Sequence, residues 1–595
     1  MVSNSNTVRF FVIFVLFKFS FGVAHASPEE FQAKGLKEFT AAEESRLNRH
    51  RIKRIKPNQR ALKRLNKERR IRGEREIVAP IEPGNEIELG SAVPDPSAEY
   101  LSSATPAQVD NSQLPSFPTI ANQGAQSSCV AWATTYYTMS HEVCLALGCD
   151  NKVARDRVFS PKWTYNMING GVDNGAYFSD AFELIHKHGA AMLSEFPYSD
   201  KEFRAWDLNS NHWLSAIQNR VSEVSAISVN TSAGIVNAKQ LLANGHVLVL
   251  PTFITSWQFR NVQADPSEAN NPFAGQFIAI YLNGKVGGHG MTIVGYDDSI
   301  WTDINGNGVV EESEKGAFKI ANSWGSGWRN AGFAWASYDA FRSVSAVPNF
   351  SPANRVQLSQ NGNAYSITYA PYSPTLVARF TLSAAKRNQM QLRLGVSSAS
   401  AQAPEASFDF GGLSGKGGAY AFDGSNSEIP GTFYVDLSSL HSGDPSQKKF
   451  YLMARDTAAG SPTSVNGFDV VIVGTMATHG SAAGLPAQLD VSSGNYVVNS
   501  TYIDTLPPTV PTNLNGKVVK VKNKKRVVLS WTVSSDNDRV AYYKIYRNGV
   551  AIGQSATSGF SDLKTAKGGK YSYQVLAVDA AGNLSELSNA AYISR

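Results

Sequence analysis

Cysteine is scarce in this chain, at 3 of 595 residues. So few cysteines exclude a disulfide-rich scaffold and the repeated cysteine clusters of zinc modules. Long apolar runs are scarce too: one lies at the N-terminus, which excludes a protein with several membrane spans. Charged residues make up 17% and apolar residues 42% of the chain, as in ordered globular proteins. A chain of this length predicts about three to five folded units.

The N-terminal apolar run has the features of a secretory signal. Arg9 precedes the apolar residues 10–23, and Ala24-His25-Ala26 follows as a small-x-small cleavage pattern. An uncleaved membrane anchor is the alternative, but the run is short and Lys18 interrupts it. We therefore expect a signal peptide over residues 1–26, a secreted protein, and no stable membrane insertion after signal removal.

The segment 27–106 begins strongly basic and ends as a linker. Its residues 29–76 hold twice as many Lys and Arg as Asp and Glu, and five prolines occur in residues 77–106. Binding to nucleic acid or to an anionic membrane is one interpretation of such a run. Its most basic stretch lacks the aromatic residues that stack on bases, so we expect no nucleic-acid partner. A removable pro-segment followed by a linker is the favoured interpretation.

Cys129 lies in the sequence QGAQSSCVAWA, where an aromatic-rich helical stretch begins. The first turn of a helix offers unpaired N–H groups and the positive end of the helix dipole, and both favour a thiolate. The alternative is a small buried apolar side chain. The other two cysteines, Cys144 and Cys149, are close in sequence, with Gly148 between them. They predict a local disulfide that leaves Cys129 free, although an intermolecular bridge stays open.

Two later motifs supply the partners that a thiol nucleophile needs. His289 precedes a predicted strand in GGHGMTIVGYDD, and Asn322 ends another in IANSWGSGW. An imidazole accepts and returns the thiol proton, and a third polar group orients the ring. Gln123 adds a hydrogen-bond donor for the oxyanion that forms on an attacked carbonyl.

From residue 111 to about residue 345 the sequence resembles the papain-like cysteine peptidases, through NQG and C at Gln123 and Cys129, GH and IVGY around His289, and NSWGSGW from Asn322. The resemblance implies an α+β domain of two lobes over residues 107–350. By that resemblance Cys129 is the nucleophile, His289 the general base and acid, and Asn322 the residue that orients the imidazole. The resemblance also implies that Gln123 contributes to the oxyanion hole and that Trp324 shields the His–Asn hydrogen bond from water. Gly175 and Ala176 would bind the substrate backbone.

The nucleophile loop departs from the family pattern at two positions. Gln126 stands where the family has a cysteine, and Val130 replaces a large aromatic residue next to the nucleophile. The disulfide that the family makes at this loop is therefore absent, and the loop must be held in another way.

Between His289 and Asn322 lies an insertion, DINGNGVVEESE, at residues 303–314. It fits the calcium-loop pattern of oxygen donors around a glycine at position 6, here Gly308. The candidate ligands are Asp303, Asn305, Asn307, Val309 through its carbonyl, Glu311 and Glu314. The alternative is a hairpin tip rich in Asp, Asn and Gly. We predict a structural Ca²⁺ ion in a hairpin, and no organic cofactor.

The remaining residues predict two all-β sandwich modules. Residues 351–504 contain short alternating runs such as YSITYAPY, TLVARFTLS and FDVVIVGT, separated by turn signals. Residues 505–595 resemble a fibronectin type III module, with Trp531, Tyr546, Tyr573 and Val575 at its usual core positions; an immunoglobulin-like sandwich is the alternative. Such modules space or anchor an enzyme, and a surface or matrix ligand is a possible partner.

The sequence thus predicts a secreted cysteine endopeptidase that acts on proteins or peptides. The competing hypothesis is a surface adhesin or matrix-binding protein that keeps the peptidase fold without its activity.

Overall fold

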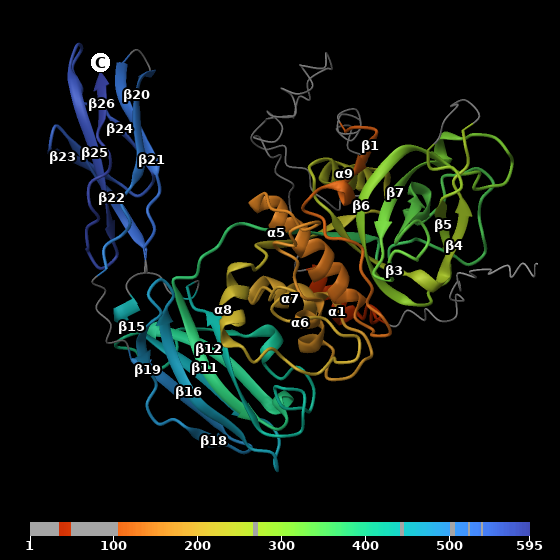
Figure 1. Cartoon of the computed structure of the whole chain (residues 1–595), viewed down its shortest axis with the longest axis horizontal. Helices are drawn as coiled ribbons and strands as arrows, with labels where there is room; N and C mark the ends of the chain where they lie inside the picture. The colour runs from red at the N-terminus through yellow and green to blue at the C-terminus, as the bar shows by residue number, and fades with distance from the viewer. Residues whose placement is uncertain are drawn as a thin grey trace, which may run out of the picture. The chain divides into compact units, whose positions relative to one another are not determined.

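The computed structural model describes residues 35–48, 105–265, 272–438, 440, 445–499, 506–521, 524–536 and 539–595 (Figure 1). The predicted signal peptide, most of the basic segment and most of the linker lie outside the described residues. Among the described residues, no helix has the length and apolar character needed to cross a membrane.

The helical segments that follow residue 128 gather in one lobe, drawn mostly in orange in Figure 1. Three segments follow end to end, namely α4 (Cys129–Ala131), the π-helical η3 (Trp132–Met139) and α5 (Ser140–Leu147). The lobe also contains α6 (Pro161–Ile168), α7 (Phe178–Lys187) and α8 (Ser210–Gln218). In α7 the apolar residues Phe178, Ala181, Phe182 and Ile185 repeat at helical spacing and are buried. Near them lies α1 (Ala41–Asn48), from the N-terminal segment.

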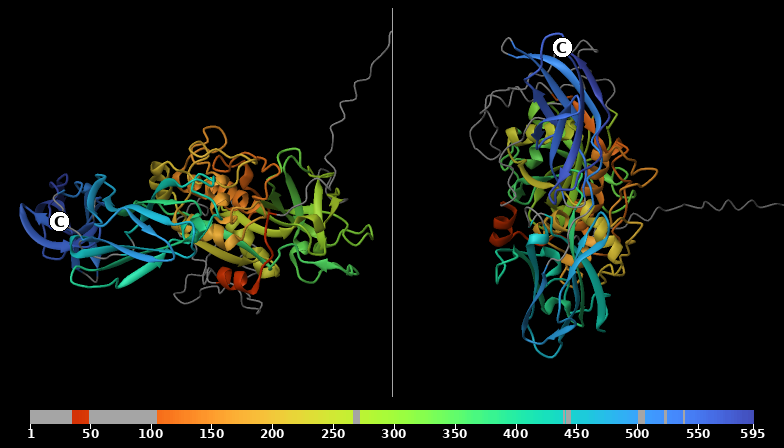
Figure 2. Two further views of the ribbon diagram at one scale, coloured as in Figure 1. Left: turned by 90° about the horizontal axis from the view of Figure 1, so that it is seen from below. Right: turned by 90° about the vertical axis from the view of Figure 1, so that its left-hand side faces the viewer.

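The second lobe is built on a ten-stranded sheet with the order β2-β10-β3-β6-β7-β8-β5-β4, in which β1 pairs with β6 and β9 with β5. The strands in chain order are β1 (Gln108–Asp110), β2 (Glu223–Ser228), β3 (Leu248–Phe253), β4 (Trp257–Asn261), β5 (Phe277–Asn283), β6 (Gly288–Trp301), β7 (Lys315–Ala321), β8 (Phe333–Ser337), β9 (Arg355–Val356) and β10 (Asn363–Thr368). Helices α9 (Ser232–Ala243) and α10 (Tyr338–Phe341) pack on it. Figure 2 shows the helices, mostly in orange, and most strands of this sheet, in yellow and green, from two further directions.

Strand β10 corrects the predicted layout of the chain. The sequence YSITYAPY predicts the opening strand of the first sandwich, but β10 pairs with β2 and β3 instead. Ala364 is buried in the core of the sheet lobe, and Tyr365 and Ile367 are buried on the opposite face of the strand, where Tyr365 contacts Phe178 and Phe182 of α7. The alternating pattern predicts a strand correctly, but a strand pattern does not specify its pairing partner.

Residues 376–499 form the first β-sandwich. One sheet has the order β14-β11-β16-β17 with β18 on β16, and the other β13-β12-β15-β19. The strands are β11 (Leu376–Ala384), β12 (Met390–Ser398), β13 (Ala406–Asp409), β14 (Ile429–Asp436), β15 (Lys448–Asp456), β16 (Thr463–Ile472), β17 (Ala477–Ser481), β18 (Ala487–Leu489) and β19 (Ser493–Asn499). Its core is continuous with that of the helical lobe: the ring of Trp213 on α8 lies 5.0 Å from Phe433 on β14 and 4.4 Å from Trp163 on α6.

The C-terminal module is a second sandwich, with sheets β20-β21-β24 and β23-β22-β25-β26. Its strands are β20 (Thr512–Val521), β21 (Lys524–Thr532), β22 (Val540–Arg547), β23 (Val550–Ser555), β24 (Gly559–Asp562), β25 (Lys570–Asp579) and β26 (Ala591–Ser594). Trp531, Tyr573 and Val575 lie in its core as predicted. Tyr546 does not, because the alternation along β22 places Tyr543 and Ile545 inward.

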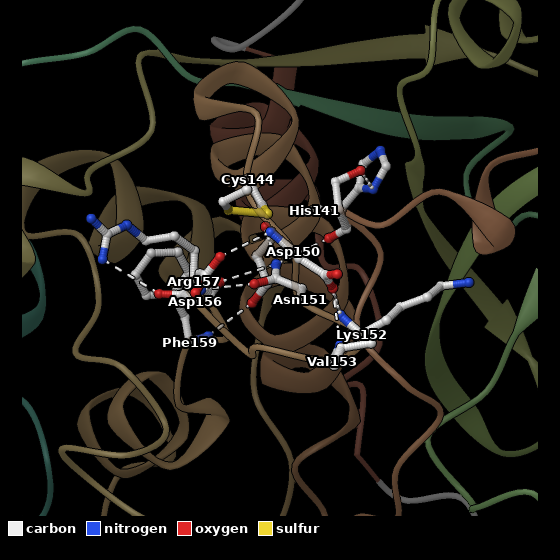
Figure 3. The surroundings of a disulfide bond; sticks show 12 residues. His141, Cys144, Asp150, Asn151, Lys152, Val153, Asp156, Arg157 and Phe159 are labelled. Carbon is white, nitrogen blue, oxygen red and sulfur yellow. Dashed lines mark hydrogen bonds between the residues drawn. A yellow bond between two sulfur atoms is a disulfide. The ribbon is translucent and has the colours of Figure 1, made fainter.

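Cys144 and Cys149 form a disulfide at the end of α5, with Cα atoms 5.0 Å apart (Figure 3). Gly148 ends the helix with φ of 72° and allows the chain to turn back. Below it, the buried Asn151 Nδ2 donates to the carbonyls of Ser116 and Ser140, at 3.0 and 2.8 Å. These bonds fix the loop after the helix, and Cys129 remains the free cysteine of the chain.

Candidate active site

Cys129 is the first residue of α4 and is completely buried. Its Sγ accepts a hydrogen bond from the backbone N–H of Gly290, at 3.3 Å, so the thiol lies against the residue that follows His289. Burial raises the pKa of the Cys129 thiol to about 12. The expectation that the helix start favours a thiolate is therefore wrong for this structure, because desolvation outweighs the backbone N–H groups.

His289 and Asn322 meet because they occupy the same end of two paired strands. His289 is near the start of β6, Asn322 follows the last residue of β7, and the pairing of Thr292 with Ala321 fixes the register. His289 Nε2 is 2.8 Å from Asn322 Oδ1 and donates to it, which leaves Nδ1 unprotonated in the neutral ring. Among the described residues the buried Nδ1 has no hydrogen-bond partner, and burial lowers the pKa of His289 to about 4.

The surroundings of this pair hold the amide and the ring in place. Asn322 Oδ1 also accepts from the N–H of Ser323, at 2.7 Å. The ring of Trp324, the predicted shield of the His–Asn bond, lies 4.7 Å from the His289 ring, centroid to centroid. The orientation of the imidazole is therefore fixed by one hydrogen bond and one aromatic contact.

Gln123 is buried beside the nucleophile loop. Its Oε1 accepts from Ser323 Oγ at 2.6 Å, and its Nε2 donates to the carbonyl of Gln126 at 2.8 Å. An amide nitrogen has two N–H donors, so this contact uses one of them. The fold thus gathers Gln123, Cys129, His289 and Asn322 at the junction of the two lobes.

Ala176, one of the two predicted substrate-backbone residues, contacts the chain's own N-terminal segment. The N–H of Ala176 donates to the carbonyl of Gly35 at 3.0 Å, and the N–H of Lys37 donates to the carbonyl of Ala176 at 3.1 Å. On the other side the N–H of Leu36 donates to the carbonyl of Gly288 at 3.1 Å. A Cβ added to Gly35 would lie 2.3 Å from Cys129 Sγ, so the segment passes directly over the thiol.

Helix α1 anchors this segment outside the site. Glu43 is buried and accepts hydrogen bonds from the N–H and the hydroxyl of Ser179, at the start of α7. Arg46 pairs with Asp180 at 2.8 Å and with Glu183 at 3.2 Å. No sequence pattern predicts the contacts of Glu43 and Arg46 with α7, because single polar residues in a basic segment give no signal of their partners.

The predicted calcium ligands lie in the hairpin between β6 and β7. Asp303 accepts backbone hydrogen bonds from Gly306, Asn307 and Gly308, at 2.6 to 3.0 Å. Glu314 accepts from the N–H of Ile304 at 2.7 Å and from the Trp301 indole at 2.9 Å.

The other candidate ligands also face partners within the hairpin. Asn305 and Asn307 donate to Glu311, at 2.8 and 3.2 Å, and the N–H of Val309 donates to Asn307. Within the part of the chain that the structure describes, no three His, Cys, Asp or Glu side chains gather as a metal site. In this arrangement the Asp303 and Glu314 carboxylates accept backbone hydrogen bonds of the hairpin.

Comparison with known proteins bears directly on the site. Residues 105–345 match the family model "Papain family cysteine protease". This chain carries a papain-family cysteine protease domain. The protease domain contains all four of the residues gathered at the lobe junction.

Among solved structures, xylellain, a cysteine protease from Xylella fastidiosa, is 20% identical over 49% of this chain and 95% of that protein, with a TM-score of 0.29. The bromelain protease of Ananas comosus is 16% identical over 44% of this chain and 100% of that one, with a TM-score of 0.29.

The curated relatives are enzymes that are not named as proteases, and each matches only a short part of this chain. An α-amylase of Niallia circulans is 46% identical over 88 residues, 15% of this chain and 7% of the amylase. Exoglucanase B of Cellulomonas fimi is 31% identical over 163 residues, 27% of this chain and 13% of that enzyme. The chain therefore spans only a small fraction of these relatives. A Fn3-like protein from Clostridium thermocellum is 24% identical over 15% of this chain and 92% of that one, with a TM-score of 0.13. The C-terminal module, with seven strands in two sheets, is a fibronectin type III module.

Proposed function

We propose that this protein is a secreted cysteine endopeptidase, made as a zymogen, that hydrolyses peptide bonds through an acyl-enzyme on Cys129. The observation that carries the proposal is the state of His289: Asn322 fixes its Nε2, and its Nδ1 has no hydrogen-bond partner among the described residues. The buried thiol accepts a hydrogen bond from the next residue, Gly290. A general base needs an open lone pair within reach of the proton that it takes.

In this mechanism the Cys129 thiol gives its proton to His289 Nδ1, and Sγ attacks the carbonyl carbon of the substrate. The oxyanion is stabilised by the Cys129 N–H and the free N–H of Gln123. The imidazolium then protonates the leaving amine, which breaks the peptide bond and leaves a thioester. Water that His289 deprotonates hydrolyses the thioester, and the thiol returns with a carboxylic acid product.

The zymogen part of the proposal is supported by the N-terminal segment. Residues 35–37 bind Ala176 and Gly288 through their backbones, which is how an extended peptide is bound beside a strand or loop. The segment buries the thiol and occupies the place of the substrate. We expect activity only after it leaves, by cleavage or displacement.

A thiol-directed peptidyl probe tests the enzymatic proposal against the inactive-adhesin hypothesis. The full chain is incubated until residues 35–48 are released, as judged by N-terminal sequencing, and is then labelled. We expect labelling that is lost in Cys129→Ala and reduced in Asn322→Ala. Absence of labelling in the released protein would favour the adhesin. Ser127→Ala is the matched control, because that residue interacts through its backbone N–H.

Calcium binding at residues 303–314 is a separate proposal. Its support is the spacing of the oxygen donors around Gly308, and the hairpin would have to exchange hydrogen bonds at Asp303 and Glu314 for the ion. Thermal melting of the full chain in Ca²⁺ and in excess chelator decides the matter. A melting temperature that rises with Ca²⁺, and fails to rise in Glu314→Gln, supports a site, whereas equal melting in both solutions rejects it.

Two further parts of the proposal are that the protein is exported and that its C-terminal modules bind a surface or matrix ligand. The signal-like residues 1–26 support export, which N-terminal sequencing of protein from the culture medium tests. A surface or matrix ligand would bind through the sandwich modules, and retention of the full chain on cell envelopes is the corresponding measurement.

A further inference from the structure

The nucleophile loop is held by hydrogen bonds that it donates to two neighbouring loops. Gln126 is 1% exposed, and its Nε2 donates to the carbonyls of Ser199 and Glu202, at 3.3 and 3.2 Å. The N–H of Ser127 donates to Asp173 Oδ1 at 2.8 Å. These contacts are made immediately before Cys129, at the position where the family's disulfide is missing.

Asp173 is itself held by a buried side chain. The same Oδ1 accepts from the hydroxyl of Tyr165 at 2.6 Å, and Tyr165 on α6 is completely buried. Burial, followed by the contact with Asp173, raises the pKa of this phenol, so the phenol stays protonated and donates. Bonds to a charged acceptor are about twice as strong as neutral ones. The carboxylate therefore links the buried helix α6 to the backbone of the nucleophile loop.

Asp173 belongs to the loop of residues 169–177, which also contains Gly175 and Ala176, and the first β-sandwich packs against this loop. A Cβ added to Gly418 of the sandwich would lie 2.5 Å from the carbonyl oxygen of Gly170. A Cβ added to Gly171 would lie 2.9 Å from the ring of Tyr420. Contacts this close mean that the two loops touch along their backbones.

A single buried arginine ties the sandwich to the loop of residues 199–206, whose carbonyls bind Gln126. The Arg387 guanidinium donates to Gly417 and Ala421 of the sandwich, and to the carbonyl of Arg204 at 2.6 Å. It also lies 4.6 Å from the ring centre of Trp206. Burial lowers the pKa of Arg387 to about 10, so it stays charged at neutral pH.

We infer that the first β-sandwich (residues 376–499) is a positioning element of the active site, acting through Asp173 and Gln126 on the residues before Cys129. The sandwich fixes the two loops, and the loops fix the nucleophile in place of a local disulfide. Asp173 is a positioning residue and takes no part in the chemistry. The inference rests on the proposed function, which it extends from the protease domain to the module that follows it.

The test compares Asp173→Ala, Asp173→Asn and Tyr420→Ala in the full chain after release of residues 35–48. Small misplacements of a reacting group cost about 10- to 100-fold in rate. For Asp173→Ala we expect such a fall in kcat, with KM changed less than about threefold. Asp173→Asn keeps an oxygen acceptor and should recover most of kcat. Asp156→Ala is the control, since that exposed carboxylate also accepts one backbone N–H, from Asp150 at 3.0 Å.

The link to the sandwich is tested by the double variant. Tyr420→Ala should lower kcat in the same direction, and its effect should largely vanish when Asp173 is already alanine. Fully additive effects, an unchanged kcat in Asp173→Ala, or a loss explained by a collapsed melting temperature would each overturn the inference.

A second measurement separates this inference from the proposed function. Iodoacetamide alkylation of Cys129, followed by mass spectrometry, requires no peptidase activity, and the other two cysteines are held in a disulfide. If the wild type cleaves no peptide, the proposed function fails. The inference then still predicts an alkylation rate in Asp173→Ala that differs at least about fivefold from Asp156→Ala. Equal rates would reject it.

Discussion

Replacing Gly35 with valine should expose the thiol that the N-terminal segment covers. The glycine has no Cβ, and an added one would lie 2.3 Å from Cys129 Sγ and 3.1 Å from the carbonyl oxygen of Ser127. Two further methyl groups cannot fit there, so the segment must move off the thiol. The hydrogen bonds of residues 35–37 to Ala176 and Gly288 would be lost with it.

The size of the effect follows from the thiol's pKa. Burial holds it at about 12, against an ordinary value of 9.0. A thiol forms its thiolate by losing a proton, so a raised pKa lowers the thiolate fraction at every pH below 12 for as long as the N-terminal segment covers Cys129. If the pKa falls the whole way, the thiolate fraction at pH 7.5 rises about a thousandfold, and a partial fall still gives about tenfold.

Iodoacetamide alkylation of the full chain between pH 6 and 10 measures this change. We expect the rate at pH 7.5 to rise between about tenfold and about a thousandfold in Gly35→Val, with the midpoint of the pH profile moved downward. Glu38→Val is the control, because Glu38 is exposed in the same segment. The reasoning is refuted if limited proteolysis shows the segment released in Gly35→Val while the alkylation rate stays within twofold of the wild type.

Other changes have effects of known direction. Asn322→Ala frees the His289 ring and should lower kcat of the released enzyme about 10- to 100-fold, measured on a fluorogenic peptide; an unchanged kcat would show that the ring is held by Trp324 alone. Gln126→Ala removes a buried amide and the two hydrogen bonds that it donates to half-buried backbone carbonyls, and should cost about 1 to 3 kcal/mol in chemical denaturation, whereas Gln113→Ala, at an exposed glutamine, should cost little. The double variant Cys144→Ala/Cys149→Ala opens a short loop and should lose about 2 kcal/mol of stability without loss of kcat; a loss of kcat would connect the disulfide to the site. Arg46→Ala removes the ion pairs to Asp180 and Glu183 and should speed release of the N-terminal segment, seen as faster appearance of activity.

The identity of the chemical groups could be predicted from the sequence, because motifs fix residue types and local elements. The cysteine at a helix start, the histidine before a strand and the asparagine after another are local features, and so are the strand pattern around them. The free state of Cys129 followed from the short spacing of the other two cysteines. The fibronectin type III module could likewise be recognised from the sequence, although Tyr546 was wrongly assigned to its core.

The tertiary structure alone decided how these groups are held and what covers them. Strand β10 joins the protease sheet and not the sandwich, since pairing depends on a partner distant in sequence. Burial under Gly35 reverses the expected state of the Cys129 thiol, because desolvation depends on neighbours that no local pattern reveals. Asp173, Arg387 and Glu43 carry no motif, and their roles arise from contacts across 46 to 183 residues of chain. Residue types and local elements can be predicted from sequence patterns, whereas burial and long-range contacts arise only when the chain folds.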